Sequence, residues 1–278
     1  MKAWLANIDR RFVYLLVGLG AALPLLVTFE LPVRATPPVR AVYEAVEEIA
    51  RKEGRGAVLI SFDYDPGSEA ELQPMARAIL RHCFQRNLRV VGVSHWPGNT
   101  DLVEEAFVTA ARDYGREQGR DYAFMGFKAG GGSLIIAMGQ DFPGAFPQDV
   151  RGNDTRTMEA MRDIRSLRDF DYVIDLAAGT PGIETWIAYG QERYKFRMGG
   201  GCTAVVAPDQ FPFLQAGQIN GLIGGLVGAA EYEALIGRKD EALGGMRPQS
   251  VVHLVVILLI FLGNLFHFLT RREGGASL

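Results

Sequence analysis

The chain has 278 residues, of which 29 are basic and 32 acidic, so its formal net charge at pH 7 is −3. A nucleic-acid-binding surface needs clustered Lys and Arg side chains, and this balance argues against one. Two cysteines, Cys83 and Cys202, lie far apart without CxxC spacing, which predicts neither a disulfide framework nor a zinc site.

An uncharged apolar run occupies residues 12–29, after a short tail of residues 1–11. Arg10 and Arg11 precede this run and Glu30 follows it, as expected for a helix that crosses a membrane. A cleaved signal peptide is the alternative, but the run is long for one and no small-x-small cleavage site follows it. We therefore predict a retained signal anchor as transmembrane helix 1.

Three prolines fall within residues 30–40, which we interpret as a stiff, extended stalk. Residues 41–52 have apolar side chains at 42, 45, 46 and 49, and this spacing predicts an amphipathic helix. The stalk thus leads into a folded domain, which we place at residues 41–240.

This domain alternates short apolar runs with amphipathic segments. Strands are predicted at 57–62, 89–94, 122–127, 172–176 and 203–207, and helices at 69–85, 101–114, 155–167 and 184–191. Ser68 and Glu71 have the spacing of a capping box before the first of these helices. Residues 131–139 fit either a strand or a helix, and Gly199–Gly201 fit a tight turn. The pattern predicts a Rossmann-like three-layer α/β domain with a mostly parallel sheet.

Polar residues follow the predicted strands, where ligands bind in open α/β sheets. The candidate ligand cleft contains Asp63, Asp65, His95, Lys128, Gly131, Thr180, Glu184 and Asp209. Lys128 with the following glycines could cradle a phosphate, but neither a GxxxxGK[ST] nor a GxGxxG pattern accompanies it. His95 has no HxH or HExxH partner, so we expect it to pack beside Trp96 rather than bind a metal.

Asp63 and Asp65 form an Asp-x-Asp pair whose carboxylates would point the same way on an extended segment. Such a pair suits Mg²⁺, and it resembles the first motif of phosphoryl-transfer enzymes of the haloacid dehalogenase type. No later Lys and paired acidic motif matches that family. We favour ordinary turn chemistry before Pro66 and Gly67 as the explanation of the pair, so Mg²⁺ enters only with the enzyme alternative.

Small residues recur four apart in residues 218–235, which we predict to be one helix. They are Gly221, Gly224, Gly225, Gly228 and Ala229. This spacing allows close backbone approach, either to the sheet of the same domain or to another subunit.

A second uncharged run of nineteen residues, 251–269, follows a linker at 241–250 and predicts transmembrane helix 2. Residues 270–278 form the C-terminal tail, where Arg271 and Arg272 stop the run. Basic residues near the spans are equally numerous on both sides. Because long translocated loops count little, we expect both termini in the cytoplasm and the α/β domain outside it.

No complete catalytic constellation appears in the sequence. We therefore expect a membrane-anchored ligand-binding or assembly component without a cofactor, acting as a homo-oligomer or with a membrane-protein partner. The alternative is a membrane-bound, metal-dependent hydrolase or phosphotransferase that uses Asp63 and Asp65, with Lys128 as electrostatic stabiliser.

Overall fold

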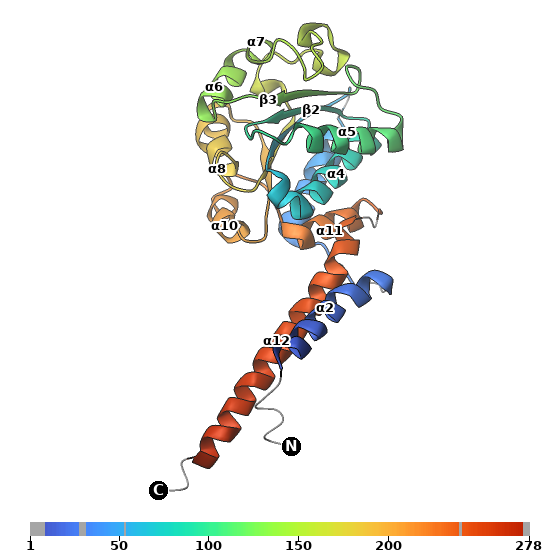
Figure 1. The fold of residues 1–278 in the computed structure, drawn as a ribbon. Coiled ribbons are helices and arrows are strands. Elements are labelled where there is room, and N and C mark those ends of the chain that lie inside the picture. The colour runs from blue at the N-terminus through green and yellow to red at the C-terminus, as the bar shows by residue number, and fades with distance from the viewer. Residues whose placement is uncertain (1–8, 28–31, 53, 239–240, 275–278) are drawn as a thin grey trace. The chain divides into compact units, whose positions relative to one another are not determined.

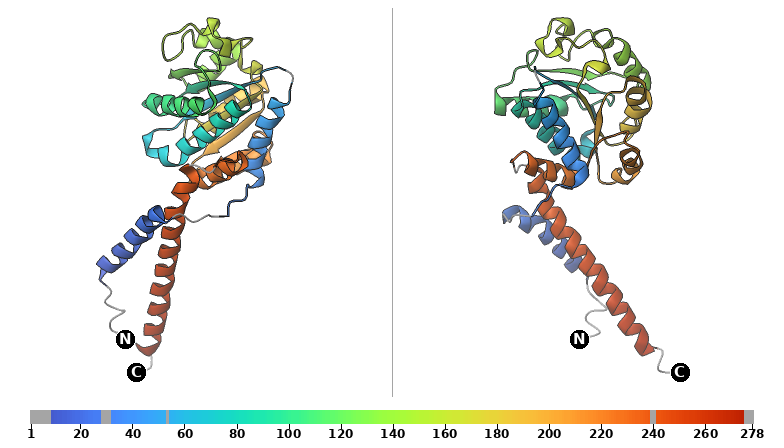
Figure 2. Two further views of the ribbon diagram at one scale, coloured as in Figure 1. Left: turned by 90° about the vertical axis from the view of Figure 1, so that its right-hand side faces the viewer. Right: turned by 180° about the vertical axis from the view of Figure 1, so that it is seen from behind.

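A computed structural model describes residues 9–27, 32–52, 54–238 and 241–274 (Figures 1 and 2). The described residues belong to two compact units. One is an α/β domain within residues 33–242, and the other contains the helix α2 (Arg10–Leu26) and most of α12 (Glu241–Gly274).

The α/β domain is built on a six-stranded sheet in which all neighbouring strands are parallel. Its strands are β1 (Ala57–Asp63), β2 (Arg89–Ser94), β3 (Tyr122–Phe127), β4 (Tyr172–Ala177), β5 (Met198–Cys202) and β6 (Leu222–Gly224). The spatial order is β3-β2-β1-β4-β5-β6, so the direction of winding reverses between β1 and β4. The predicted Rossmann-like α/β fold with a parallel sheet is confirmed.

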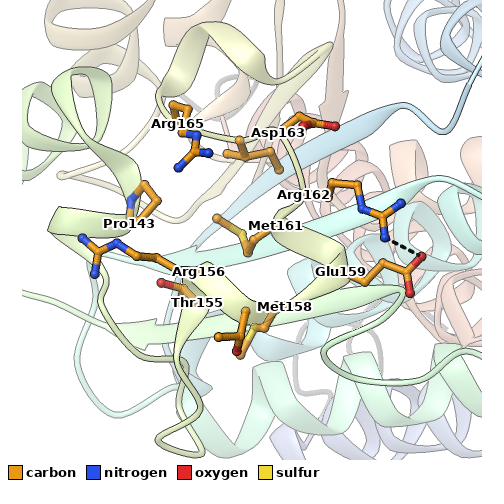
Figure 3. Close-up of a pocket in the computed structure, with 11 residues that line it drawn as sticks. Pro143, Thr155, Arg156, Met158, Glu159, Met161, Arg162, Asp163 and Arg165 are labelled. Atoms are coloured by element: carbon orange, nitrogen blue, oxygen red, sulfur yellow. Dashed lines mark ion pairs between the residues drawn. The ribbon is translucent and has the colours of Figure 1, made fainter.

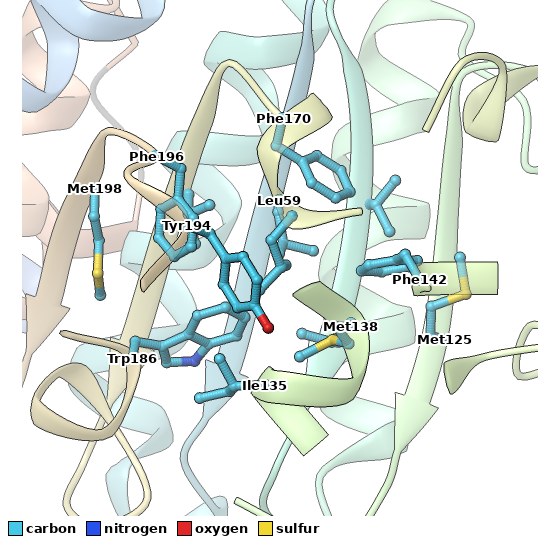
Figure 4. Close-up of a cluster of buried hydrophobic side chains, with 14 of the residues drawn as sticks. Leu59, Met125, Ile135, Met138, Phe142, Phe170, Trp186, Tyr194, Phe196 and Met198 are labelled. Atoms are coloured by element: carbon cyan, nitrogen blue, oxygen red, sulfur yellow. The ribbon is translucent and has the colours of Figure 1, made fainter. Parts of the chain in front are cut away.

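Helices cover both faces of the sheet (Figure 1). Alternate side chains of a strand face opposite sides, and Phe62 packs against Phe107 on one side, with ring centroids 5.6 Å apart. That layer contains α3 (Pro37–Ala50), α4 (Glu69–Gln85), α5 (Thr100–Tyr114) and α11 (Gly225–Leu235). Leu59 faces the other side, where it joins a buried cluster with Ile135, Phe142 and Trp186 (Figure 4). The helices there include α6 (Gly132–Gln140), α7 (Phe142–Ala145) and α8 (Ile183–Trp186).

Helix α8 continues through a π-helical turn (Ile187–Gln191) into α9 (Glu192–Tyr194), and α10 (Ala207–Gln215) follows β5. The predicted bounds of α4, β2 and β3 are confirmed, and of the two alternatives for residues 131–139 the helix is correct, since α6 begins at Gly132. These segments carry strong local patterns, which explains the agreement.

The predicted stalk is wrong at its carboxyl end, because α3 already begins at Pro37. Proline is tolerated in the first helical turn, where its missing N–H would have no partner in any case. Thr36 precedes this helix, and both its backbone N–H and its hydroxyl donate to Glu231 Oε2, at 2.8 and 2.7 Å.

Two further local predictions fail because side chains take other partners. Ser68 makes no capping hydrogen bond, and Glu71 Oε2 instead accepts from the Ala204 N–H at 2.8 Å. Residues 155–167 form 3₁₀ turns rather than one helix, since Asp154 caps the backbone locally through the Arg156 N–H. The turns are Thr155–Thr157, Glu159–Met161 and Leu167–Asp169, and another (Pro66–Ser68) precedes α4.

The predicted last strand at 203–207 is also wrong. The strand β5 is the glycine-rich segment before it, for which the sequence predicts a turn. A Cβ on Gly199 would lie 2.1 Å from the Tyr172 hydroxyl oxygen, and one on Gly201 would lie 2.3 Å from Met75 Sδ. Only glycines allow β5 to approach its neighbours this closely.

Residues 218–235 are not one helix, because Leu222–Gly224 form β6 before α11 begins. A Cβ on Gly221 would lie 2.6 Å from Pro38 O, one on Gly224 3.2 Å from Ala207 Cβ, and one on Gly228 3.0 Å from Ile223 Cγ2. Ala229 is fully buried. The close packing predicted for these small residues thus occurs inside the domain, while a contact between subunits stays a prediction.

In the second unit, one stretch of the described residues, Ala242–Leu265 of α12, is long and apolar enough to cross a membrane, with a mean hydropathy of 1.9. Large apolar side chains on it are exposed, including Leu254 at 68% and Ile257 at 63%. Residues 241–250, expected as a linker, are helical and belong to α12. Helix α2 includes residues 12–26 of the first predicted span, which is 12–29, and residues 28 and 29 lie outside the described part.

Replacing Gly225 with Ala should destabilise the domain more than the same change at Gly115. Both residues have left-handed φ angles, 60° and 61°, so they share a backbone penalty of about 1–2 kcal/mol. A Cβ on Gly225 would lie 2.8 Å from Ala204 Cβ, whereas nothing lies within 4 Å of one on Gly115. We expect an additional loss of roughly 1–3 kcal/mol in denaturant-induced unfolding. Equal losses in the two variants would contradict the close contact.

Candidate functional site

A cluster of buried polar side chains lies at the carboxyl ends of the central strands, on the face covered by α8. Ser61 and Asp63 are two apart on β1 and therefore point to the same face. Asp175 on β4 is in register with Ser61, and His95 follows β2 directly. These residues meet Trp186 of α8 at the point where the strand order reverses, the usual place for a ligand site in such sheets.

Asp63 is the hydrogen-bond acceptor at the centre of this cluster. Its carboxylate accepts from Ser61 Oγ and from the His95 backbone N–H, both at 2.7 Å, and from Trp186 Nε1 at 3.4 Å. His95 Nδ1 lies 3.1 Å from Asp63 Oδ2 and 3.3 Å from Ser61 Oγ. Because these groups donate to it while it is fully buried, Asp63 is best satisfied as the ionised carboxylate.

Asp175 has the opposite environment, since neither of its carboxyl oxygens has a hydrogen-bond partner although the residue is fully buried. Burial and the negative charge of Asp63 raise the pKa of Asp175 well above its usual range. It is therefore the protonated member of the pair. Our sequence reasoning missed this residue; the available signal was a single acidic residue within an otherwise apolar predicted strand.

Cys202 lies on β5, the strand beyond β4. It is in register with Ala177 of β4, and Ala177 is in register with Asp63 of β1. Burial and the nearby Asp175 raise the pKa of the Cys202 thiol to about 12. The thiol is therefore protonated at neutral pH, and it does not have the character of a nucleophile.

A cavity of about 180 Å³ opens at the carboxyl ends of β4 and β5. We call it the β4–β5 pocket, and it is lined by Ala177, Gly179, Thr180, Gly182, Ile183, Glu184, Val206, Asp209 and Gln210. Ala177 belongs to the same row of side chains as Asp63, so the pocket borders the buried cluster. Only 3% of the surface of Gln210 is exposed, and its Oε1 has no hydrogen-bond partner among the described residues.

The loops that follow β2, β3 and β4 meet beside this pocket. Trp96 Nε1 donates to Pro181 O at 2.8 Å, and a Cβ on Gly179 would lie 3.5 Å from the Trp96 ring. A Cβ on Gly131 would lie 3.6 Å from Pro181. The structure thus brings Thr180, Glu184 and Asp209 into one pocket and places Gly131 near its rim loop.

Two of the predicted cleft residues point elsewhere. Lys128 donates to Ala145 O, and its Nζ lies 5.4 Å from the centre of the Phe146 ring. Asp65 is partly exposed in the loop after β1, whereas Asp63 is buried and already occupied by donors. The two aspartates thus have different surroundings, and a Mg²⁺ site shared by them stays a prediction. Within residues that the structure describes, no group of three or more His, Cys, Asp or Glu is placed to hold a metal ion.

Comparison of the chain with protein-family models, with curated protein sequences and with solved structures gave no match.

Replacing Asp175 with Asn should raise the free energy of unfolding at neutral pH by on the order of 1–3 kcal/mol, because the wild-type carboxyl must take up a proton when it is buried beside Asp63 and the neutral amide need not. Between pH 3.8, the usual pKa of an aspartate, and the higher pKa of Asp175 in the folded protein, the folded state holds a proton on Asp175 that the unfolded state has lost. Across that range the wild-type protein loses stability as pH rises, and the variant should lack this slope. Denaturant unfolding at a series of pH values measures both effects.

The matched control is Asp63→Asn, which should destabilise because its carboxylate accepts several hydrogen bonds. If both variants lost stability alike, the assignment of Asp175 as the neutral, unsatisfied partner would be wrong.

Proposed function

We propose that this chain is a membrane-anchored ligand-binding protein whose α/β domain binds a small, cationic or donor-rich ligand in the β4–β5 pocket. One observation carries the proposal: Thr180, Glu184 and Asp209 line a single cavity beside the reversal of strand order. Ligands bind at this position in open α/β sheets because loops of opposite direction separate there and leave a crevice.

The chemistry of the pocket favours a ligand that donates hydrogen bonds. Glu184 and Asp209 are exposed carboxylates, and Gln210 offers a buried carbonyl oxygen without a partner. The residues that line the pocket include neither Lys nor Arg. A protonated primary amine has three N–H donors and one positive charge, so it suits a pocket with two carboxylates and an amide oxygen.

The buried cluster around Asp63 positions the loops that line the pocket, and it does not itself contact the ligand. Asp63 ties β1 to the residue after β2 and to Trp186, and its backbone oxygen accepts from the Ala178 N–H at 3.0 Å. These bonds fix the start of the loop that carries Thr180. A site held in this way loses little entropy when a ligand binds.

Membrane anchoring is the second part of the proposal. The apolar stretch of α12 supports one span, and we propose α2 as part of a second span, as predicted from residues 12–29. Phe12 and Leu25 of α2 are 65% and 70% exposed, which suits contact with lipid. With two spans, both termini would lie in the cytoplasm and the α/β domain outside it. Assembly into a homo-oligomer, or with a membrane-protein partner, stays a prediction.

The enzyme alternative, a metal-dependent hydrolase or phosphotransferase, also stays a prediction. No contact of Asp63, Asp65 or Lys128 specifically favours it. It would be supported by a thermal shift with Mg²⁺ that disappears in the Asp63→Ala/Asp65→Ala variant.

Ligand binding is testable with primary-amine fragments and with carboxylic acids of the same size. We expect saturation-transfer NMR of the detergent-solubilised protein to detect amines and not acids. Glu184→Gln and Asp209→Asn should each weaken amine binding about tenfold, because each removes one charged partner.

Glu44→Gln is the control, since Glu44 is exposed on α3 and does not line the pocket. It removes the same charge and should leave binding unchanged. Equal binding of acids, or an equal effect of Glu44→Gln, would contradict a site in the β4–β5 pocket.

The two-span topology is testable by labelling single introduced cysteines with a membrane-impermeant maleimide. Cys83 and Cys202 are buried and should not react in the folded protein. We expect Val205→Cys, at a position 85% exposed, to be labelled in intact cells. Ala3→Cys and Ser277→Cys should be labelled only after permeabilisation. If one tail reacts together with Val205→Cys in intact cells, the chain has a single span.

A further inference from the structure

A second group of charged side chains lies on the segment between α7 and β4, which we call the arginine loop and define as residues 154–169. Its 3₁₀ turns are held by local caps: Asp154 accepts from the Arg156 N–H, and Asp169 accepts from the Arg165 and Ser166 N–H groups at 2.9 and 2.7 Å. Its apolar side chains are buried in the core beneath it, namely Met158, Ala160, Met161, Ile164 and Leu167. The loop is therefore a fixed part of the fold although it contains no α-helix.

The arginine loop lies at the amino-terminal edge of the sheet. Arg89, the first residue of β2, donates to Arg162 O, and the Ala160 N–H donates to Gly119 O at 2.9 Å, shortly before β3. All strands are parallel, so this edge is opposite to the one that carries the β4–β5 pocket. Any site here is independent of the function proposed above.

A cavity of about 290 Å³ is formed by this loop together with Pro143. Three arginines line it, and one of them, Arg162, is paired with Glu159 at 3.8 Å. Figure 3 shows this pair and Asp163 on one side of the pocket, and the guanidinium groups of Arg156 and Arg165 on the other. No ion pair is formed by Arg156 or Arg165 with any residue that the structure describes.

We propose that Arg156 and Arg165 form a binding site for the phosphoryl group of a small soluble ligand. The backbone of both residues is held by local caps, and each exposed guanidinium group presents a planar fork of donors. A carboxylate offers only two oxygens and is satisfied by one fork, whereas a phosphoryl group offers three oxygens and engages both. Glu159 is paired with Arg162, and the carboxylates of Asp154 and Asp169 accept from backbone N–H groups, so the guanidinium groups of Arg156 and Arg165 keep their donors for a ligand.

The test is titration of the full-length, detergent-solubilised protein with inorganic phosphate at constant ionic strength, followed by isothermal calorimetry. We expect saturable binding that weakens about tenfold or more in Arg156→Gln and in Arg165→Gln, as expected for loss of charge-assisted hydrogen bonds. Acetate in the same buffer should bind much more weakly than phosphate.

Arg151→Gln is the matched control, because Arg151 is an exposed arginine nearby that pairs with Glu104 at 3.6 Å and does not line the pocket. It changes the net charge equally and should leave phosphate affinity unchanged. The thermal unfolding midpoints of both pocket variants should match wild type, since neither side chain is buried. Absence of saturation, acetate binding equal to phosphate, or an equal loss in Arg151→Gln would each overturn the proposal.

Discussion

The carboxylate of Asp63 connects more separate parts of this domain than any other contact described above. It accepts hydrogen bonds from its own strand, from the residue after β2 and from the indole of α8, while its backbone oxygen accepts from the residue after β4. At the reversal of strand order between β1 and β4, the donors of Ser61, His95 and Trp186 would otherwise be buried without partners. One buried charge satisfies them, and its cost is offset only because all its donors are present.

This arrangement also accounts for Asp175. Two carboxyl groups on adjacent strands in a water-free interior cannot both be ionised, so the one with donors keeps the charge and the other keeps a proton. Buried carboxyl groups with a raised pKa occur most often at functional sites. The β4–β5 pocket is close to Asp175, since it is lined by Ala177, two residues further along β4. The pocket at the opposite edge of the sheet is lined by three arginines as well as by Glu159 and Asp163, whereas the β4–β5 pocket is lined by no basic residue. The two proposed ligands, an amine at one edge and a phosphoryl group at the other, differ accordingly in charge.

The accuracy of the sequence predictions follows the range of the interactions that decide each element. Helix α4 and strands β2 and β3 have the predicted bounds because their periodicity and burial are local properties. Strand β5 was missed because a Gly-Gly-Gly segment has no apolar pattern, and it becomes a strand only where Tyr172 and Met75 crowd it from neighbouring elements. The split of residues 218–235 has the same cause, since Gly221 is pressed against α3, which is distant in sequence.

By itself, the sequence determined the alternation of strands and helices, the parallel sheet and an apolar helix of membrane-spanning length, because each depends on composition and periodicity over neighbouring residues. Only the tertiary structure decided which polar side chains share a site. It separated Asp63 from Asp65, turned Lys128 toward α7, and joined Thr180 with Glu184 and Asp209. Strand order and loop contacts set these groupings, and both arise from packing between segments that are far apart in the chain.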